Sequence, residues 1–294
     1  MSNYEVIRKE LLDDIKAQES QEVLNLKEFD KKFNKLFEIV NFDMMNDSND
    51  KFYGIFLSSC NRVKSYGIGA PFSHQMFNSK INLLINPLEI VKLEMNDVKL
   101  YLKHEVIHLV SEHYELVEKL SLQYPKMIPL LAADMIANDI LQKESRDLHK
   151  NMLTVDRFNT TFNTDLTITN LGMAEVCEKI SELAKNNPSL NKFINDHNAF
   201  VIEKAQEELE KELRKYKSND DEDILAPPED MDGDGGASGE GMPMDLEKLA
   251  EMLMASVMKV KGDMACIGEM LKNVVIDTMS QSRGKYPGGL MSLL

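Results

Sequence analysis

The chain has 294 residues, of which 43% are hydrophobic and 28% charged, and its formal net charge is −15. A chain of this length and composition can bury a sizeable core, as one large domain with or without an appendage. The acidic balance argues against nucleic-acid binding, which requires a basic face, and it disfavours attachment to an anionic membrane surface.

The cysteines and the N-terminus indicate the compartment. Cys60, Cys177 and Cys266 are odd in number, far apart and without a CxxC spacing, so a disulfide framework is not expected. The first residues, MSNYEVIRKELLDD, are charged and contain no apolar core, so we expect no signal peptide. No run of about 18 apolar residues occurs, and no membrane span is predicted. We therefore expect a cytoplasmic protein.

The N-terminal part combines helices with short strands. Apolar residues at helical spacing predict amphipathic helices over residues 4–19 and 25–41. Segments 51–59 (KFYGIFLSS) and 80–85 (KINLLI) are short and rich in aromatic or branched residues, so they are predicted to be strands. The stretch SYGIGAPFS between them is predicted as turn and loop, with room for a third strand. Asn86–Pro87 ends the second strand, because proline cannot donate a hydrogen bond to a ladder.

Further along the chain the helical period returns. It predicts one helix over residues 96–119 and another over 127–144. The polar segment 145–170 is predicted as loop, and helices are expected again at 172–186 and 190–217. The expected fold class is therefore α+β and predominantly helical.

A change of composition indicates the domain boundaries. Residues 218–243 are acidic and rich in glycine and proline, so they are predicted to form a disordered linker. A Met-rich amphipathic helix is predicted over 245–283. The predicted organisation is a domain at 1–217, the linker, and a helical appendage at 244–294.

The segment YLKHEVIHLVSEHY carries the candidate chemistry. His104 and His108 are four residues apart, so on a helix both imidazoles lie on one face and can reach a single cation. Glu105 lies about 100° round the helix from His104, within reach of the same site without being a ligand. This HExxH arrangement predicts that His104 and His108 bind zinc and that Glu105 is the general base.

This arrangement predicts a reaction. Zinc held by imidazoles, with one position left open, lowers the pKa of bound water to near neutrality. Glu105 would take the proton and later deliver it to the leaving amine. The predicted function is zinc-dependent hydrolysis of peptide bonds, and the alternative is a non-catalytic, metal-stabilised interaction module. An interpretation without metal treats the two histidines as ordinary helix residues and Glu105 as a surface acid.

A third protein ligand is required, and the predicted helix IPLLAADMIANDIL offers Asp134. It is an acid inside an apolar stretch, and a buried aspartate must be paired or bound to a metal. Asn138, one turn further on the same face, could orient Asp134 or a water molecule. The other candidates for this ligand are Glu112, Asp139, Glu144 and His149. A pairing of Asp134 with a lysine would need no metal.

Residues just beyond the two histidines are predicted to surround the ligands. His113 lies about 180° round the helix from His104, so on a straight helix it points away from the metal. The spacing HExxHxxGxxH also fails, because Ser111 stands at the glycine position and Tyr114 at the third histidine. Glu112 is predicted to hold a histidine in place, together with His113 and Asn138. Candidates for stabilising an oxyanion are Tyr53, Tyr66, Tyr114, His113 and His149.

Four motifs in order resemble a known family: NP, HEVIHLVSEH, AADMIAND and RGKYPGGL. Together they are similar to the metallopeptidase domain that precedes von Willebrand factor A-like domains in bacteria and their phages. The matching positions are Asn86 and Pro87; His104, Glu105, His108 and His113; Ala132, Ala133, Asp134 and Asn138; Arg283, Gly284, Pro287, Gly289 and Leu290. The resemblance covers most of the chain from residue 50 onward.

The resemblance implies a zincin-like fold, in which a small twisted sheet packs on the HExxH helix, with a zinc site and peptidase activity. Proteins of this family are found beside MoxR-type AAA+ ATPases, which suggests an ATPase partner in a bacterial cell or a phage-infected host. The chain has no DxSxS-like motif, so we expect a member without the C-terminal domain, which weakens the case for that partner. In zinc peptidases an edge strand can pair with an extended substrate, and residues 80–85 could be such a strand or a plain core strand.

Overall fold

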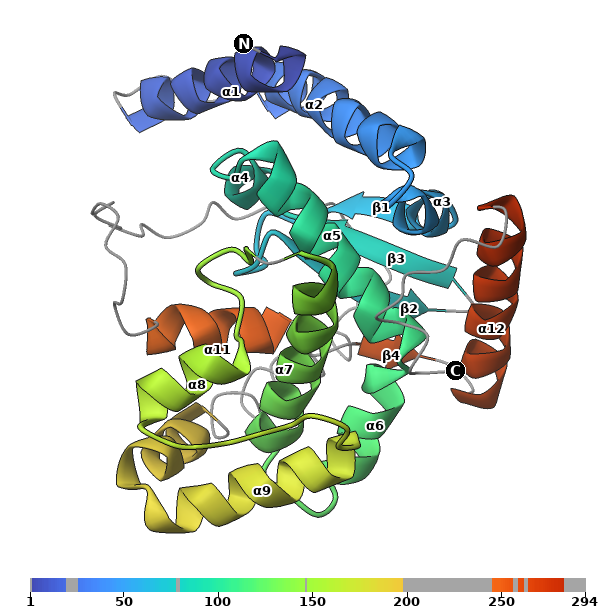
Figure 1. The fold of residues 1–294 in the computed structure, drawn as a ribbon. Helices are drawn as coiled ribbons and strands as arrows, with labels where there is room; N and C mark the ends of the chain where they lie inside the picture. Colours follow the sequence, from blue (N-terminus) through green and yellow to red (C-terminus); the bar gives the residue numbers. More distant parts are fainter. Residues whose placement is uncertain are drawn as a thin grey trace, which may run out of the picture.

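The computed structural model describes residues 2–19, 26–77, 80–145, 147–197, 245–255, 259–261 and 264–282. In this part of the chain the fold is predominantly helical with one small mixed sheet, which confirms the α+β expectation. Helices α1 (Asn3–Glu19) and α2 (Leu26–Asn46) lie together at one end of the molecule (Figure 1). Helices α7 (Met127–Glu144), α8 (Val155–Phe162) and α9 (Met173–Asn186) form the other end, with α5 (Met95–Val110) and the sheet between.

The sheet has four strands in the order β1-β3-β2-β4. Their bounds are Asn61–Lys64 for β1, Phe72–Phe77 for β2, Lys80–Ile85 for β3 and Lys259–Lys261 for β4. β3 is antiparallel to β2, whereas β1 pairs parallel to β3 and β4 parallel to β2. The strand predicted at 80–85 is confirmed as β3, but it is central, so its interpretation as a substrate-pairing edge is wrong.

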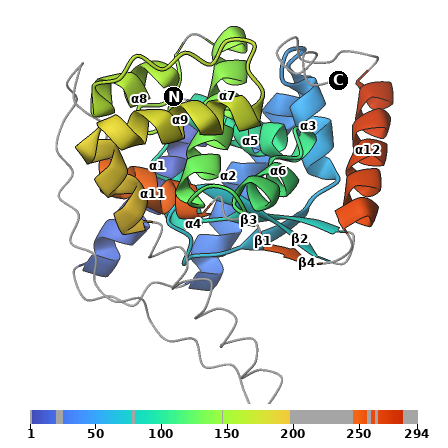
Figure 2. The same cartoon turned by 90° about the horizontal axis from the view of Figure 1, so that it is seen from below.

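Helix α5 is the element around which the rest is built. It contacts β2 on the inner side of the sheet, α2 and α3 (Lys51–Ser58) on another side, and α7 opposite (Figure 2). All of its residues from Leu100 to Leu109 are consequently buried. A polar side chain on such a helix must find its partner inside the protein, because water does not reach it.

Two apolar clusters meet along α7. The N-terminal part of α7, from Met127 to Met135, packs in one cluster with α6 (His113–Leu120), α8, α9 and α11 (Leu246–Ala255). Its C-terminal part, from Ala137 to Leu141, packs in the other cluster with α1, α2, α3, the sheet and α5. The segment around Asp134 and Asn138 therefore lies where the two clusters join.

The segment predicted as a strand over 51–59 is a helix, α3 (Lys51–Ser58), so that prediction is wrong. Its residues 52–57 are all buried, and a short apolar run has no period that separates a buried strand from a buried helix. Gly54 permits the helical packing, because a Cβ there would lie 3.0 Å from the backbone nitrogen of Met45 in α2. Asp50 precedes α3 and forms ion pairs with Lys99 and Lys103 of α5, at 2.8 and 2.5 Å.

The single helix predicted over 96–119 is two helices, α5 and α6 (His113–Leu120). The break is at Glu112, whose φ of 51° lies in the left-handed region that ends a helix. Upstream, Asn86–Pro87 ends β3 as predicted and also begins α4 (Pro87–Ile90), where the Asn86 side chain accepts a hydrogen bond from the Leu88 amide at 3.1 Å.

Other boundaries were predicted with mixed success. The helices expected at 4–19, 25–41, 127–144 and 172–186 correspond to α1, α2, α7 and α9. The expected loop 145–170 contains α8, and the single helix expected at 245–283 is α11, β4 and α12 (Met264–Gln281). Residues 188–197 are helical, but the remainder of the helix predicted at 190–217 lies outside the described residues, as do the linker 218–243 and the motif RGKYPGGL.

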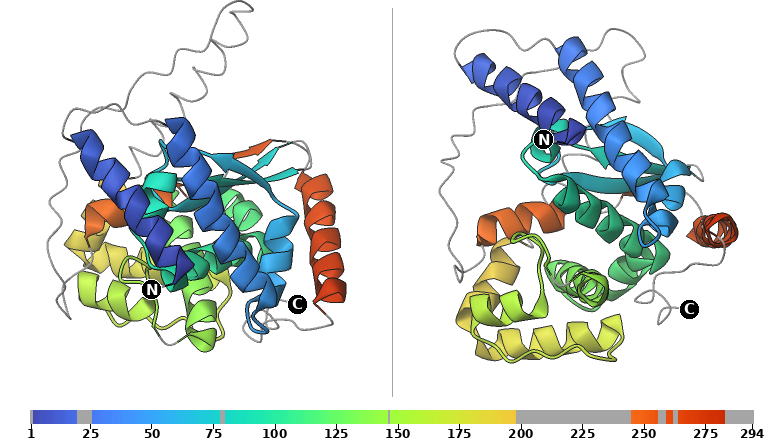
Figure 3. Two further views of the ribbon diagram at one scale, coloured as in Figure 1. Left: turned by 90° about the horizontal axis from the view of Figure 1, so that it is seen from above. Right: turned by 45° about the horizontal axis from the view of Figure 1, so that its top comes forward.

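The C-terminal elements pack into the main body. Helix α11 contacts α7, and α12 contacts α3 and α5 at the opposite flank of the molecule (Figure 3). None of the helices in the described ranges is both long enough and apolar enough to cross a bilayer. The thiols of Cys60 and Cys177 are buried and free, and the side chain of Cys266 is outside the described part.

Candidate metal centre

Two facing helices bring three side chains together. His104 and His108 come from α5 and Asp134 comes from α7, and one donor atom of each lies within 4.8 Å of the others. Asp134 Oδ1 is 3.4 Å from His104 Nε2 and 3.5 Å from His108 Nε2, and the two Nε2 atoms are 2.9 Å apart. All three side chains are buried. This His-His-Asp group could hold a metal ion.

The separations fit a small divalent cation. Ligands about 2.0–2.1 Å from a tetrahedral ion are about 3.3–3.4 Å from one another. The two distances from Asp134 to the histidines have this length, and the distance between the histidines is somewhat shorter. Two imidazoles and a carboxylate suit zinc and related first-row metals. Three donors also leave a fourth tetrahedral position open.

A hydrogen bond behind His104 determines which ring nitrogen faces the site. His104 Nδ1 is 2.9 Å from Asn138 Oδ1, and Asn138 Nδ2 donates to the Leu153 carbonyl at 2.8 Å. Because a carbonyl only accepts, Asn138 must present its oxygen to His104, and His104 Nδ1 must carry the proton. In the neutral ring, His104 Nε2 then has a free lone pair directed at the other two donors.

His108 is supported by His113. The Nδ1 atoms of the two rings are 3.0 Å apart, and both side chains are buried. The direction expected for His113 on a straight helix does not hold, because α5 ends at Val110 and the chain turns back at Glu112. His113 lies behind His108, outside the group of three donors.

Glu105 is bonded to a residue that the motif does not contain. Its Oε2 is 2.6 Å from Nδ1 of His74 in β2, and the two side chains are only 6% and 1% exposed. Burial acts to raise the pKa of Glu105, but the hydrogen bond to His74 and the nearby imidazoles of His104 and His108 outweigh it and hold the pKa below its ordinary value. These neighbours therefore favour the ionised carboxylate of Glu105.

The electrostatics of the three donors favour a cation. Burial acts to raise the pKa of Asp134, but His104 and His108 lower it by more, so the pKa lies well below its ordinary value. Burial acts to lower the pKa of His104, but the Asp134 carboxylate outweighs it, whereas burial and His104 leave the pKa of His108 below its ordinary value. A buried carboxylate that stays ionised needs positive charge beside it, from a protonated imidazole or from a metal.

The other candidates for the third ligand are elsewhere. Those with partners are Asp139 with Lys143 at 3.0 Å, Glu144 with the Tyr53 hydroxyl at 3.0 Å, and His149 with the Tyr101 hydroxyl at 2.9 Å. Glu112 is exposed. Its carboxylate lies beside α12, where a Cβ added at Gly268 would be 3.7 Å from Oε1. None of the four belongs to the group of donors found in the described residues.

The candidates for stabilising an oxyanion are also mostly engaged. Tyr53, Tyr66 and His149 are bonded to Glu144, Asp30 and Tyr101 respectively. The Tyr114 hydroxyl is buried and finds no hydrogen-bond partner in the described part of the chain. His74 could not be predicted from the sequence, because nothing in the segment FSHQMF relates it to a motif 30 residues later.

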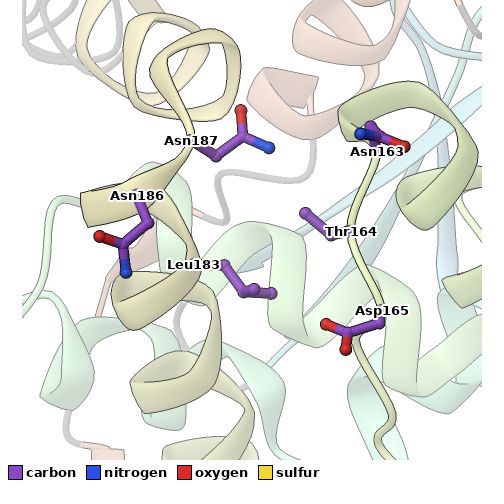
Figure 4. Close-up of a pocket in the computed structure, with 6 residues that line it drawn as sticks. All are labelled: Asn163, Thr164, Asp165, Leu183, Asn186 and Asn187. Carbon is purple, nitrogen blue, oxygen red and sulfur yellow. The ribbon is translucent and has the colours of Figure 1, made fainter.

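A separate cavity of about 390 Å³ lies between the end of α8 and the end of α9 (Figure 4). Its lining residues are Asn163, Thr164, Asp165, Leu183, Asn186 and Asn187. Only Asp165 among them is titratable, so this cavity supplies no second set of metal ligands.

Comparisons with protein-family models, with curated proteins and with solved structures found no match. The side chains of the His-His-Asp group and those bonded to it are therefore the features that indicate a function.

Proposed function

We propose that this chain is a zinc-dependent metallopeptidase with a zincin-like fold, in which His104, His108 and Asp134 bind zinc and Glu105 is the general base. The observation that carries this proposal is the position of Asp134. It comes from a different helix, yet its carboxylate lies 3.4 and 3.5 Å from the two histidines of the HExxH motif. A small sheet against the motif helix gives further support.

The residues would divide the chemistry between them. Zinc, when bound, lowers the pKa of water and polarises a carbonyl group. Asn138 and His113 hold the rings of His104 and His108, so that each ligand nitrogen keeps its direction. Glu105, ionised and buried, accepts a proton from water and delivers it to the leaving amine. The substrate would be a protein or peptide.

The proposal is tested by Glu105→Gln, which keeps the size of the side chain and removes its basicity. We expect zinc content and melting temperature to stay close to wild type while cleavage of an unfolded protein such as casein falls at least about 100-fold. Glu118→Gln is the matched control, because Glu118 is exposed on α6 and pairs only with Lys126 among the described residues. Cleavage at the wild-type rate by Glu105→Gln would contradict the proposal.

One observation favours a second candidate, a non-catalytic, metal-stabilised module that serves a MoxR-type AAA+ ATPase or a larger assembly. All three donors are buried and Glu105 is bonded to His74, as in a closed structural site. Structural zinc sites, however, normally have four protein ligands, and three are found here in the described residues. The module predicts bound zinc, no cleavage of any substrate, and loss of complex assembly when the site is removed. For either candidate the free thiols favour the cytoplasm.

A further inference from the structure

His74, a residue of the sheet, lies beside the metal centre. It lies in the middle of β2, opposite Leu83 of β3, and its side chain is 1% exposed. Its ring centre is 6.3 Å from that of His108, and its Nδ1 is 2.6 Å from Glu105 Oε2. The His74–Glu105 pair therefore lies directly beside the three donors, and a strand paired on both sides holds it there.

The two oxygens of Glu105 are in different situations. Oε2 is bonded to His74, whereas no hydrogen bond from any described residue reaches Oε1. A carboxylate held at one oxygen has a fixed direction at the other, since rotation about its last bonds would break the anchoring hydrogen bond. The free oxygen is the one that can accept a proton.

Without the hydrogen bond to His74, the Glu105 carboxylate could itself bind the metal. Its carboxylate is close enough to His104 and His108 for their charges to act on it. A divalent cation held by three donors, with one position open, attracts any nearby carboxylate as a fourth ligand. Such a ligand would occupy the position that a substrate or water must use. Glu105 could then no longer accept a proton from that water.

We propose that His74 is a positioning residue that anchors Glu105 through Oε2, keeps this carboxylate off the metal, and leaves Oε1 as the proton acceptor. The inference rests on the proposed metal site and deepens it by assigning how the fourth position stays open. It requires no titration of His74, only the hydrogen bond that the ring donates.

The test uses the full chain loaded with Co²⁺ in place of zinc, whose visible absorption reports ligand changes, and azide as a small anion for the open position. In the wild type, azide should change the spectrum. In His74→Ala, the released carboxylate should occupy that position and weaken azide binding at least about tenfold. His74→Asn, which keeps a donor, should bind azide much as the wild type does. His74→Ala/Glu105→Gln should regain azide binding, because the competing carboxylate is gone.

Activity supplies a second measurement. Misplacing the base should lower kcat of His74→Ala about 100-fold with little change in KM, and His74→Asn should recover most of that loss. His197→Ala is the control, because His197 bonds to the Phe193 carbonyl of its own helix. Unchanged azide binding in His74→Ala, or no response to azide in the wild type, would overturn the inference about His74. A wild-type chain that takes up no Co²⁺ or Zn²⁺ would instead refute the metal site itself.

Discussion

Asn138 gives the sharpest test of how the metal centre is supported, because its amide oxygen and its amide nitrogen form hydrogen bonds to different groups. The side chain is 0% exposed, accepts a hydrogen bond from His104 and donates one to the Leu153 carbonyl. Asn138→Ala leaves a buried N–H and a buried carbonyl without partners. At about 1–3 kcal/mol for each group, the free energy of unfolding should fall by about 2–6 kcal/mol. Losing the group behind His104 should also weaken zinc binding by about 10–100-fold.

Asn138→Asp separates the two effects. Its carboxylate still accepts from His104 Nδ1, but it can no longer donate to the Leu153 carbonyl. We expect the metal-free protein to lose stability, as in Asn138→Ala, while zinc affinity stays near wild type. Urea unfolding followed by circular dichroism gives the stability, and competition with a chromophoric chelator gives the affinity. The reasoning is refuted if Asn138→Ala binds zinc as tightly as wild type, or if Asn138→Asp binds it as weakly as Asn138→Ala.

Three further predictions concern residues that fix the positions of α3, α5 and α6 around the site. Burial acts to raise the pKa of Asp50, but hydrogen bonds from two lysines lower it below its ordinary value of 3.8. The stability that Asp50 contributes is therefore present above pH 3.8 and is lost as the pH falls further. Asp50→Asn should flatten the acid limb of a plot of Tm against pH, and an unchanged limb would contradict this prediction. Glu112→Gly should raise the unfolding free energy by up to about 1 kcal/mol, because glycine adopts the left-handed conformation freely, and a clear loss in urea unfolding would contradict this. Gly54→Ala should cost about 1–3 kcal/mol in the same assay, since the added Cβ meets the α2 backbone at 3.0 Å, and a neutral result would mean that α2 moves freely.

The donors of the site could be predicted because each has a local signal. His104 and His108 are related by one helical turn, and the structure confirms that they share a helix face. Asp134 was detectable because an acid in the middle of an apolar helix needs a partner. Asn138 was expected on the same face, although its bond to His104 rather than to Asp134 depends on where the Leu153 carbonyl lies.

What was missed depends on tertiary contacts. The apolar segment 51–59 has no distinguishing period, and its helix is selected by the close approach of α2 at Gly54. The break at Glu112 has no glycine or proline to mark it, yet it is what brings His113 back to His108. His74 reaches Glu105 only because β2 lies against α5, and that contact joins residues 31 positions apart.

The central claim is that three side chains from two helices bind one zinc ion, and the metal content of the purified chain tests it most directly. Elemental mass spectrometry of the wild type should find close to one zinc per chain, and Asp134→Ala should lose most of it while Asp139→Ala, which changes the neighbouring acid that faces Lys143, keeps it. A wild-type chain without metal after zinc is supplied, or an Asp134→Ala chain that keeps its zinc, would contradict the account.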